Sequence, residues 1–217
     1  MKLQQNSKLV MIGDSITDGG RTRPVGEGLF DALGHGYVSL VDALLGAVYP
    51  ERGIRVVNMG CGGHTVLDLK ERWQTDVLDL KPDWLSIMIG TNDIWRQFDS
   101  PRQTETHVLP DVYEKTLDEL VSRTLPLVPN IVLMTPFYLE PNLADPMRRR
   151  MDEYGAIVRD LSEKHGTLFV DTQAAFDTVL VEYYPATIAW DRVHPSLTGH
   201  MVLARAFLNT IDFAWSV

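Results

Sequence analysis

Cysteine is almost absent from this chain, whose 217 residues include one, Cys61. A single thiol excludes an internal disulfide, and a chain without disulfides suits a reducing compartment. Long apolar runs are missing too, and the stretch from Leu9 to Ile12 is too short for the core of a signal peptide. We therefore expect a cytoplasmic protein that does not associate with a membrane.

An excess of positive charge is also lacking. The 29 acidic residues outnumber the 20 basic ones, and the formal net charge is −9. Such a chain repels polyanions, so we expect no nucleic-acid partner. The basic cluster Arg148 to Arg150 lies next to acidic residues and is typical of a solvated helix face.

The spacing that a metal site requires is not seen either. The histidines His64, His107, His165 and His200 lack the paired spacing of a zinc site. Cys61 lies between two glycines, where a small packed side chain is adequate. We expect no metal, no other cofactor and a structural role for the thiol.

Short runs rich in valine and isoleucine alternate with segments of helical period. The runs predict strands over residues 9–13, 54–58, 84–89, 131–134 and 168–171. Strands that alternate with helices favour an α/β fold, a three-layer α/β/α sandwich around a five-stranded parallel sheet. No repeat or linker-like composition interrupts the chain, so residues 1–217 are expected to form a single domain.

Helical spacing of apolar residues is clearest in four segments. It predicts helices over residues 38–48, 65–80, 146–161 and 198–211, with Thr65 as an N-cap and a helix end near Gly166. Two stretches, residues 16–36 and 95–111, are predicted to be irregular, and both follow the ends of predicted strands. Loops beyond the carboxyl ends of parallel strands are where ligands bind in such folds.

The first predicted strand leads directly into the segment Gly-Asp-Ser-Ile-Thr-Asp-Gly, which places Ser15 at a tight turn. A serine hydroxyl in that position is exposed and could act as a nucleophile. A serine between aspartate and isoleucine in a turn is equally typical of ordinary turn chemistry, so the motif is weak when taken alone.

Near the other end of the chain, Asp191 and His194 lie three residues apart. This spacing suits a pair in which the carboxylate holds the Nδ1 proton of the ring, so that Nε2 can act as a general base toward Ser15. The alternative is a surface aspartate and histidine at a helix start.

Two further segments offer donors for an oxyanion. The glycine-rich segment 58–65 follows the second strand, and Gly63 could present a backbone N–H. The segment 90–93 follows the third strand, and Asn92 carries a side-chain amide. A serine hydrolase needs such donors, so the four segments together predict an acyl-transfer site.

These four blocks resemble those of the SGNH subgroup of GDSL esterases, in the same order. The resemblance implies a flavodoxin-like SGNH hydrolase fold in which Ser15, Asp191 and His194 form the triad. It also implies that the Ser15 and Gly63 backbones and the Asn92 side chain form the oxyanion hole.

Longer segments resemble bacterial intracellular acetylxylan esterases: Arg-Pro-Val-Gly-Glu-Gly, Asn-Asp-Ile-Trp-Arg-Gln-Phe-Asp, Met-Thr-Pro-Phe-Tyr and Ala-Trp-Asp-Arg-Val-His-Pro. This resemblance implies removal of acetyl groups from xylo-oligosaccharides, without a metal, by a homo-oligomer. One departure is Gly62 before Gly63, where a Ser-Gly pair is common; it leaves the backbone donor intact.

Residues next to the catalytic segments are candidates for substrate contact, namely Asp14, Trp95 and Trp190. Aromatic faces can pack against a sugar ring, but Trp190, with Tyr183 and Tyr184 close by in sequence, favours a subunit contact or a pocket wall. Arg21, Arg23 and Glu27 either brace the long loop after Ser15 or line the rim of the pocket.

Three other functions remain open. Asp14, Asp18 and Asp93 could hold Mg²⁺ in a phosphohydrolase. The chain could be a carbohydrate-binding module that has the fold without the reaction. It could also be a lysophospholipase or thioesterase of the same family, although no segment resembles a long apolar lid, which favours a short acyl group.

Overall fold

The computed structural model describes residues 1–215. Five parallel strands form one sheet in the order β2-β1-β3-β4-β5. Their bounds are Lys8–Gly13 for β1, Arg55–Gly60 for β2, Trp84–Met88 for β3, Asn130–Met134 for β4 and Leu168–Val170 for β5. Each lies within two residues of a predicted strand, and the five-stranded parallel sheet is confirmed.

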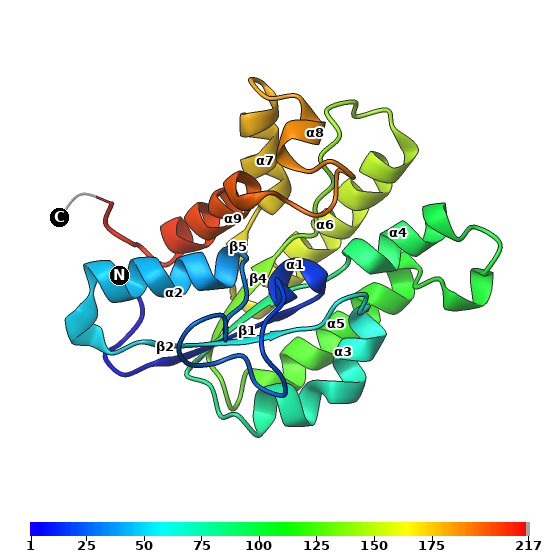
Figure 1. The fold of residues 1–217 in the computed structure, drawn as a ribbon. Helices are drawn as coiled ribbons and strands as arrows, with labels where there is room; N and C mark the ends of the chain where they lie inside the picture. Colours follow the sequence, from blue (N-terminus) through cyan, green and yellow to red (C-terminus); the bar gives the residue numbers. More distant parts are fainter. Residues whose placement is uncertain (216–217) are drawn as a thin grey trace.

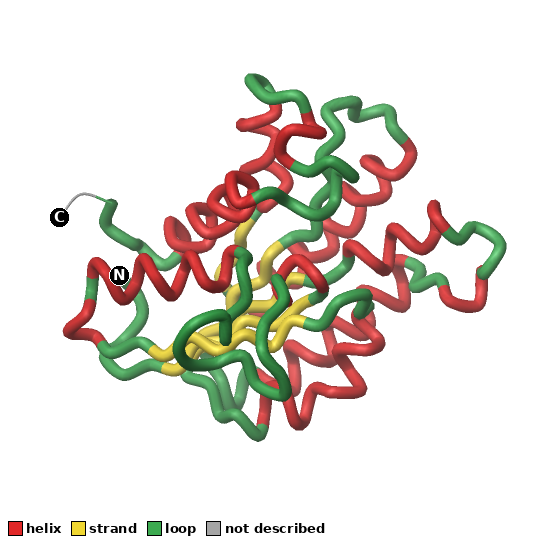
Figure 2. The backbone as a smooth tube through the Cα atoms, viewed as in Figure 1, coloured by secondary structure: helices red, strands yellow, loops and turns green. Residues whose placement is uncertain are grey.

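Helices lie on both faces of the sheet, which forms the central layer in Figure 2. Helices α2 (Tyr37–Val48), α7 (Thr172–Leu180) and α9 (Leu197–Thr210) pack together on one side. Helices α3 (Val66–Trp73), α5 (Pro110–Thr124) and α6 (Pro146–His165) form the other layer (Figure 1). The predicted three-layer α/β/α sandwich is therefore confirmed.

Shorter helices occur in the connections. They are α1 (Ser15–Asp18), α4 (Thr91–Asp99), α8 (Pro185–Ile188), the 3₁₀ turns η1 (Pro50–Arg52) and η3 (Thr104–Thr106), and the π-helical turn η2 (Gln74–Leu78) that continues α3. The prediction of an irregular stretch over residues 95–111 was wrong at both ends. Helix α4 extends through Asp99, and α5 begins at Pro110, because a proline at the first helical position is well tolerated.

Local capping explains why several helices begin and end where they do. Thr65 caps α3 in a capping box with Asp68, and the Asp145 side chain accepts hydrogen bonds from two N–H groups at the start of α6. Gly166 ends α6 in a left-handed conformation with φ of 64°. The predicted N-cap at Thr65 and the predicted helix end at Gly166 are confirmed.

Strand order creates a switch point in the sheet. After β1 the chain crosses to β2 on one side, and after β2 it returns to β3 on the other side of β1. The connections that leave β1 and β3 therefore diverge, and ligands in such folds bind beyond the carboxyl ends of these strands.

Asn58 links this edge of the sheet to the segment that follows β1. Its side-chain amide donates to the carbonyl groups of Thr17, Asp18 and Leu33, and its oxygen accepts from the Gly60 N–H at 2.8 Å. The residue is completely buried. Removal of this side chain would leave several buried polar groups without partners, and each such group lowers the free energy of unfolding.

We predict that Asn58→Ala lowers the free energy of unfolding by at least about 2 kcal/mol, measured by urea denaturation. Asn130→Ala is the control, because that amide also bonds a backbone carbonyl, of Asp83, but in an exposed position. We expect the control to cost less than about 1 kcal/mol. Equal losses in the two variants would contradict the bracing role of Asn58.

Candidate active site

The carboxyl ends of β1, β2 and β3 lie side by side. Gly13 at the end of β1 is in register with Gly60 of β2 and Met88 of β3. The segments that follow these strands carry Ser15, Gly63 and Asn92. The parallel sheet thus brings three of the predicted site residues to one edge, where α1 lies in Figure 1.

Helix α1 begins at Ser15 and sits directly against this edge. A Cβ at Gly13 would lie 2.3 Å from the Met88 carbonyl oxygen, and one at Gly60 would lie 2.1 Å from the Asp18 nitrogen. Glycine at both positions therefore allows the close approach of α1 to the strands.

Asp14 is the N-cap of α1, and its Oδ1 accepts a hydrogen bond from the Ile16 N–H at 3.0 Å. The residue is 2 % exposed. The carboxyl therefore holds the turn at Ser15 from inside the fold, and contact of Asp14 with a substrate stays a prediction. Burial raises the pKa of Asp14 to about 6, although the Ile16 N–H and nearby positive charge oppose the shift.

Ser15, His194 and Asp191 form a continuous chain of hydrogen bonds. The Ser15 Oγ lies 2.9 Å from the His194 Nε2, and the His194 Nδ1 lies 2.6 Å from the Asp191 Oδ2. The other oxygen of Asp191 accepts from the backbone N–H groups of Val193 and His194, at 3.0 and 2.8 Å. The carboxylate therefore fixes both the ring and the loop that carries it.

Hydrogen bonding keeps Asp191 ionised. Burial would raise its pKa, but the donors from His194 and Val193 outweigh burial and lower it. His200, from α9, lies nearby and accepts the Tyr37 N–H through Nδ1. Burial and the adjacent His194 lower the pKa of His200 to about 4, so this imidazole is neutral at ordinary pH.

The loop between Asp191 and His194 is held from outside the triad. Arg192 adopts a left-handed conformation with φ of 64°, and its carbonyl accepts the Leu139 N–H at 2.9 Å. Its guanidinium pairs with Glu140, which is 8 % exposed. The Glu140 carbonyl in turn accepts a hydrogen bond from the buried Arg148. These contacts hold the unusual backbone that presents His194.

Three N–H donors lie in the segments that follow β1, β2 and β3 at this edge of the sheet. Among the described residues, the backbone N–H groups of Ser15 and Gly63 have no hydrogen-bond partner. Asn92 donates one amide hydrogen to the His64 carbonyl at 3.0 Å, which leaves the other free. Gly63 has φ of 80° and open space where a side chain would project. These donors can stabilise a negatively charged oxygen.

Charged side chains hold the loop that carries Gly63. The Asp18 Oδ2 accepts the Gly62 N–H at 3.1 Å, and Arg72 donates to the His64 ring at 3.1 Å. Arg72 also bonds the carbonyl groups of Met59 and Gly13. The loop is therefore tied to both β1 and β2.

The charged side chains of the long loop after α1 make specific contacts in the structure. Arg21 is buried and donates to the carbonyl groups of Gly60 and Pro24, so it braces the loop. Arg23 is half exposed and pairs with Asp18 at 2.5 Å, and Asp18 in turn bonds the loop that carries Gly63. Glu27 pairs with Arg55 on the surface at the start of β2.

The two candidate tryptophans differ in their surroundings. The Trp95 ring lies 5.7 Å from the His194 ring, measured between centroids, and is half-buried, so it flanks the triad. Trp190 is 84 % exposed. Substrate contact stays a prediction for both residues.

Asp14, Asp18 and Asp93 do not form a ligand set. Asp18 is paired with Arg23, Asp14 caps α1, and Asp93 accepts the Val66 N–H at 3.0 Å. Within residues 1–215, no three histidine, cysteine or acidic side chains are grouped as metal ligands would be. The alternative of a Mg²⁺ phosphohydrolase thus finds no cluster of carboxylates to support it.

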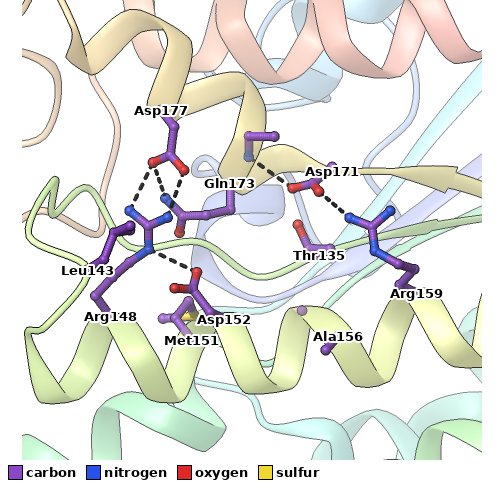
Figure 3. A pocket seen from close by; sticks show the side chains of 12 residues that line it. Thr135, Leu143, Arg148, Met151, Asp152, Ala156, Arg159, Asp171, Gln173 and Asp177 are labelled. Carbon is purple, nitrogen blue, oxygen red and sulfur yellow. Dashed lines mark hydrogen bonds and ion pairs between the residues drawn. The ribbon is translucent and has the colours of Figure 1, made fainter.

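A hollow of about 390 Å³ lies between α6 and α7, away from the triad (Figure 3). Its charged groups are paired with one another: Arg148 with Asp152 and Asp177, and Arg159 with Asp171. Gln173 is also satisfied, by Tyr138 and Asp177. The polar lining therefore stabilises the contact between the helices and leaves few groups for a ligand.

The bracing contacts of several residues were not predicted, among them those of Asn58, Arg72, Glu140 and Arg192. Asp93 was expected only as one of three possible Mg²⁺ ligands, and its hydrogen bond to Val66 was not foreseen. Glu140 and Arg192 are 52 positions apart, and no spacing in the sequence links them.

Residues 11–202 match the GDSL-like lipase/acylhydrolase family. The acetylxylan esterase of Geobacillus stearothermophilus is 62% identical over 215 residues, which cover 99% of this chain and 98% of the relative. A crystal structure of a catalytic mutant of that esterase has a TM-score of 0.99 and 61% identity, and covers 100% of this chain and 99% of its own. An alpha/beta hydrolase from the metagenome of Lake Arreo, Spain, has a TM-score of 0.98 and 56% identity, with 100% of both chains covered.

Proposed function

The chain belongs to the GDSL-like lipase/acylhydrolase family, and from this premise we propose that it is an acetylxylan esterase. It is a serine carboxylesterase that removes acetyl groups from xylo-oligosaccharides. The observation that carries the assignment to serine chemistry is the pair of hydrogen bonds, 2.9 and 2.6 Å long, that joins Ser15 to His194 and His194 to Asp191. The similarity to the Geobacillus enzyme supports the choice of substrate.

In the first half of the proposed reaction, the Ser15 Oγ attacks the acetyl carbonyl and gives its proton to the His194 Nε2. The N–H groups of Ser15, Gly63 and Asn92 stabilise the tetrahedral oxyanion. His194 then passes the proton to the sugar oxygen as the ester bond breaks. This leaves an acetyl group on Ser15 and a free sugar hydroxyl.

In the second half, water replaces the sugar. His194 takes a proton from the water, the resulting hydroxide attacks the acetyl carbon, and the same donors stabilise the second oxyanion. Collapse of this intermediate releases acetate, and His194 returns the proton to Ser15. Asp191 stabilises the imidazolium in both halves and keeps the correct ring nitrogen facing the serine.

A short acyl group fits the surroundings of the triad. The His194 side chain is 45% exposed, and the hydrogen bond between Ser15 and His194 faces solvent. A long acyl chain gains affinity only where apolar side chains cover it. A sugar can instead remain hydrated beside an open site.

We place this activity in the cytoplasm on the ground of the single, unpaired Cys61. Within residues 1–215, no helix is both long and apolar enough to cross a membrane. Cell fractionation with an antibody to the chain checks this placement, and recovery of the protein outside the cell would contradict it.

We also propose that the protein is a homo-oligomer. Aromatic side chains are unusually exposed around α8: Trp190 at 84 %, Tyr184 at 70 % and Tyr183 at 51 %. Tyr183 and the exposed Leu197 line a hollow of about 430 Å³ between α7 and α9. Exposed apolar surface of this kind marks interaction sites, and aromatic residues are enriched there.

The triad assignment predicts that Ser15→Ala and His194→Ala lower kcat by at least about 10³, and Asp191→Ala by somewhat less. The loss in the Ser15→Ala, His194→Ala double variant should not be additive, since the two groups act as one unit. Release of acetate from acetylated xylobiose, followed by NMR, measures all four. A His194→Ala enzyme with the wild-type rate near neutral pH would remove the proposed base.

The open site predicts that kcat/KM falls as the acyl chain lengthens. We expect 4-nitrophenyl acetate to be cleaved faster than the butyrate ester and the butyrate ester faster than longer ones, in assays with one enzyme preparation. Faster cleavage of butyrate would favour a lipase or lysophospholipase instead.

For the assembly, we predict that Trp190→Ala gives a smaller species in analytical ultracentrifugation, because the exposed indole supplies apolar contact area. Leu67→Ala is a matched control, since Leu67 is also an exposed apolar residue but lies on α3. If Trp190→Ala kept both the wild-type mass and the wild-type activity, Trp190 would belong neither to an interface nor to the substrate site.

A further inference from the structure

A buried carboxyl lies behind the loop that carries Gly63. Asp93 follows Asn92 in α4 and is 1 % exposed. Its Oδ1 accepts a hydrogen bond of 3.0 Å from the N–H of Val66, the first residue of α3, three positions after Gly63. Asn92 bonds the His64 carbonyl in the same segment. Two consecutive side chains of α4 therefore hold the segment between β2 and α3.

The second oxygen of Asp93 is buried without a partner. Among the described residues, nothing donates a hydrogen bond to Oδ2. Four titratable groups interact electrostatically with Asp93: Asp14 at the N-cap of α1, Asp68 on α3, Tyr113 on α5 and Tyr154 on α6. None of these four is a cation, so nothing among them balances a negative charge.

The two tyrosine hydroxyls donate their hydrogen bonds to backbone carbonyl groups and not to Asp93. Tyr113 donates to the Ile89 carbonyl at 2.9 Å, and Tyr154 donates to the Val108 carbonyl. Asp14 and Asp68 would repel a charge on Asp93. An unpaired charge in such surroundings is far more costly than an unpaired neutral hydroxyl.

We propose that Asp93 is a positioning residue that works as a neutral carboxylic acid. Its Oδ1 holds the start of α3 and thereby fixes the Gly63 N–H, while the proton on Oδ2 keeps a negative charge out of the space behind the oxyanion. The second effect matters because charges interact strongly where water is excluded, and an anion there would oppose the oxyanion of the reaction. This inference rests on the acyl-transfer reaction proposed above and assigns a further residue to it.

The ionisation behaviour of Asp93 agrees with this geometry. Burial, together with the negative charges of Asp14 and Asp68, raises its pKa to about 7 despite the Val66 N–H. The folded protein thus keeps a proton that the unfolded chain loses near the ordinary value of 3.8. Because the folded state binds more protons in this window, Asp93 makes the protein less stable as the pH rises from 3.8 to about 7.

The kinetic test compares Asp93→Asn, which is neutral and keeps an acceptor oxygen, with Asp93→Ala, which has neither carboxyl oxygen. At about pH 6 with 4-nitrophenyl acetate, we expect the Asn variant to keep kcat within about threefold of wild type. We expect the Ala variant to lose about tenfold in kcat with a much smaller change in KM, because a displaced oxyanion donor acts in the transition state. Asp160→Asn is the charge-matched control, since Asp160 is exposed on α6.

A folded Ala variant with the wild-type kcat, or a folded Asn variant as slow as the Ala variant, would overturn the positioning role. Retention of fold is checked by circular dichroism. If Asp93→Ala does not fold, the comparison of Asp93→Asn with wild type still decides the protonation state, through the following measurement.

The second test does not depend on activity. Thermal unfolding is followed from about pH 4 to about pH 7 for wild type, Asp93→Asn and Asp160→Asn. We expect Tm of Asp93→Asn to rise relative to wild type as the pH increases, while Asp160→Asn follows wild type. If the difference in Tm between Asp93→Asn and wild type stayed constant across this pH range, Asp93 would be ionised in the folded protein. That result would overturn the proposal that Asp93 is a neutral acid. If instead no Ser15-dependent ester cleavage were found, the proposed function would fail. The Tm comparison would still report whether Asp93 is protonated in the folded protein.

Discussion

The hydrogen bond between Ser15 and His194 joins two groups that are 179 positions apart in the chain. One hydrogen bond contributes only about 1 kcal/mol net, far less than the entropy lost in ordering the two loops. The contact therefore depends on structure that forms for other reasons. The parallel sheet places Ser15 at the end of β1, and the contacts of Arg192 with Leu139 and Glu140 bring His194 to it.

The loop that carries Gly63 also depends on structure elsewhere, since side chains from several elements hold it. Asp18 of α1, Arg72 of α3 and Asn92 of α4 each bond the segment from Gly62 to His64. The segment is thus held in place by the fold itself, and preorganisation of this kind is what the proposed oxyanion hole requires.

Much of the fold could be read from local patterns. The five strands lie where short valine- and isoleucine-rich runs predict them, and Thr65, Asp145 and Gly166 bound helices by ordinary capping chemistry. Helix α5 was missed although Tyr113, Leu117 and Leu120 recur at helical spacing. That signal was present in the sequence. By contrast, α4 extends into the stretch predicted to be irregular, and it packs there against α6 from a distant part of the chain.

The sequence by itself determined the alternation of strands and helices, and its motifs marked Ser15, Gly63, Asn92, Asp191 and His194 as one site, because these signals are local. Only the tertiary structure decided that Asp14 is buried at the start of α1, that Glu140 holds Arg192, and that Asp93 lies among acids and tyrosines. Burial and charge depend on neighbours from distant parts of the chain. Such neighbours are chosen by the packing of the whole fold and leave no periodic trace in the sequence.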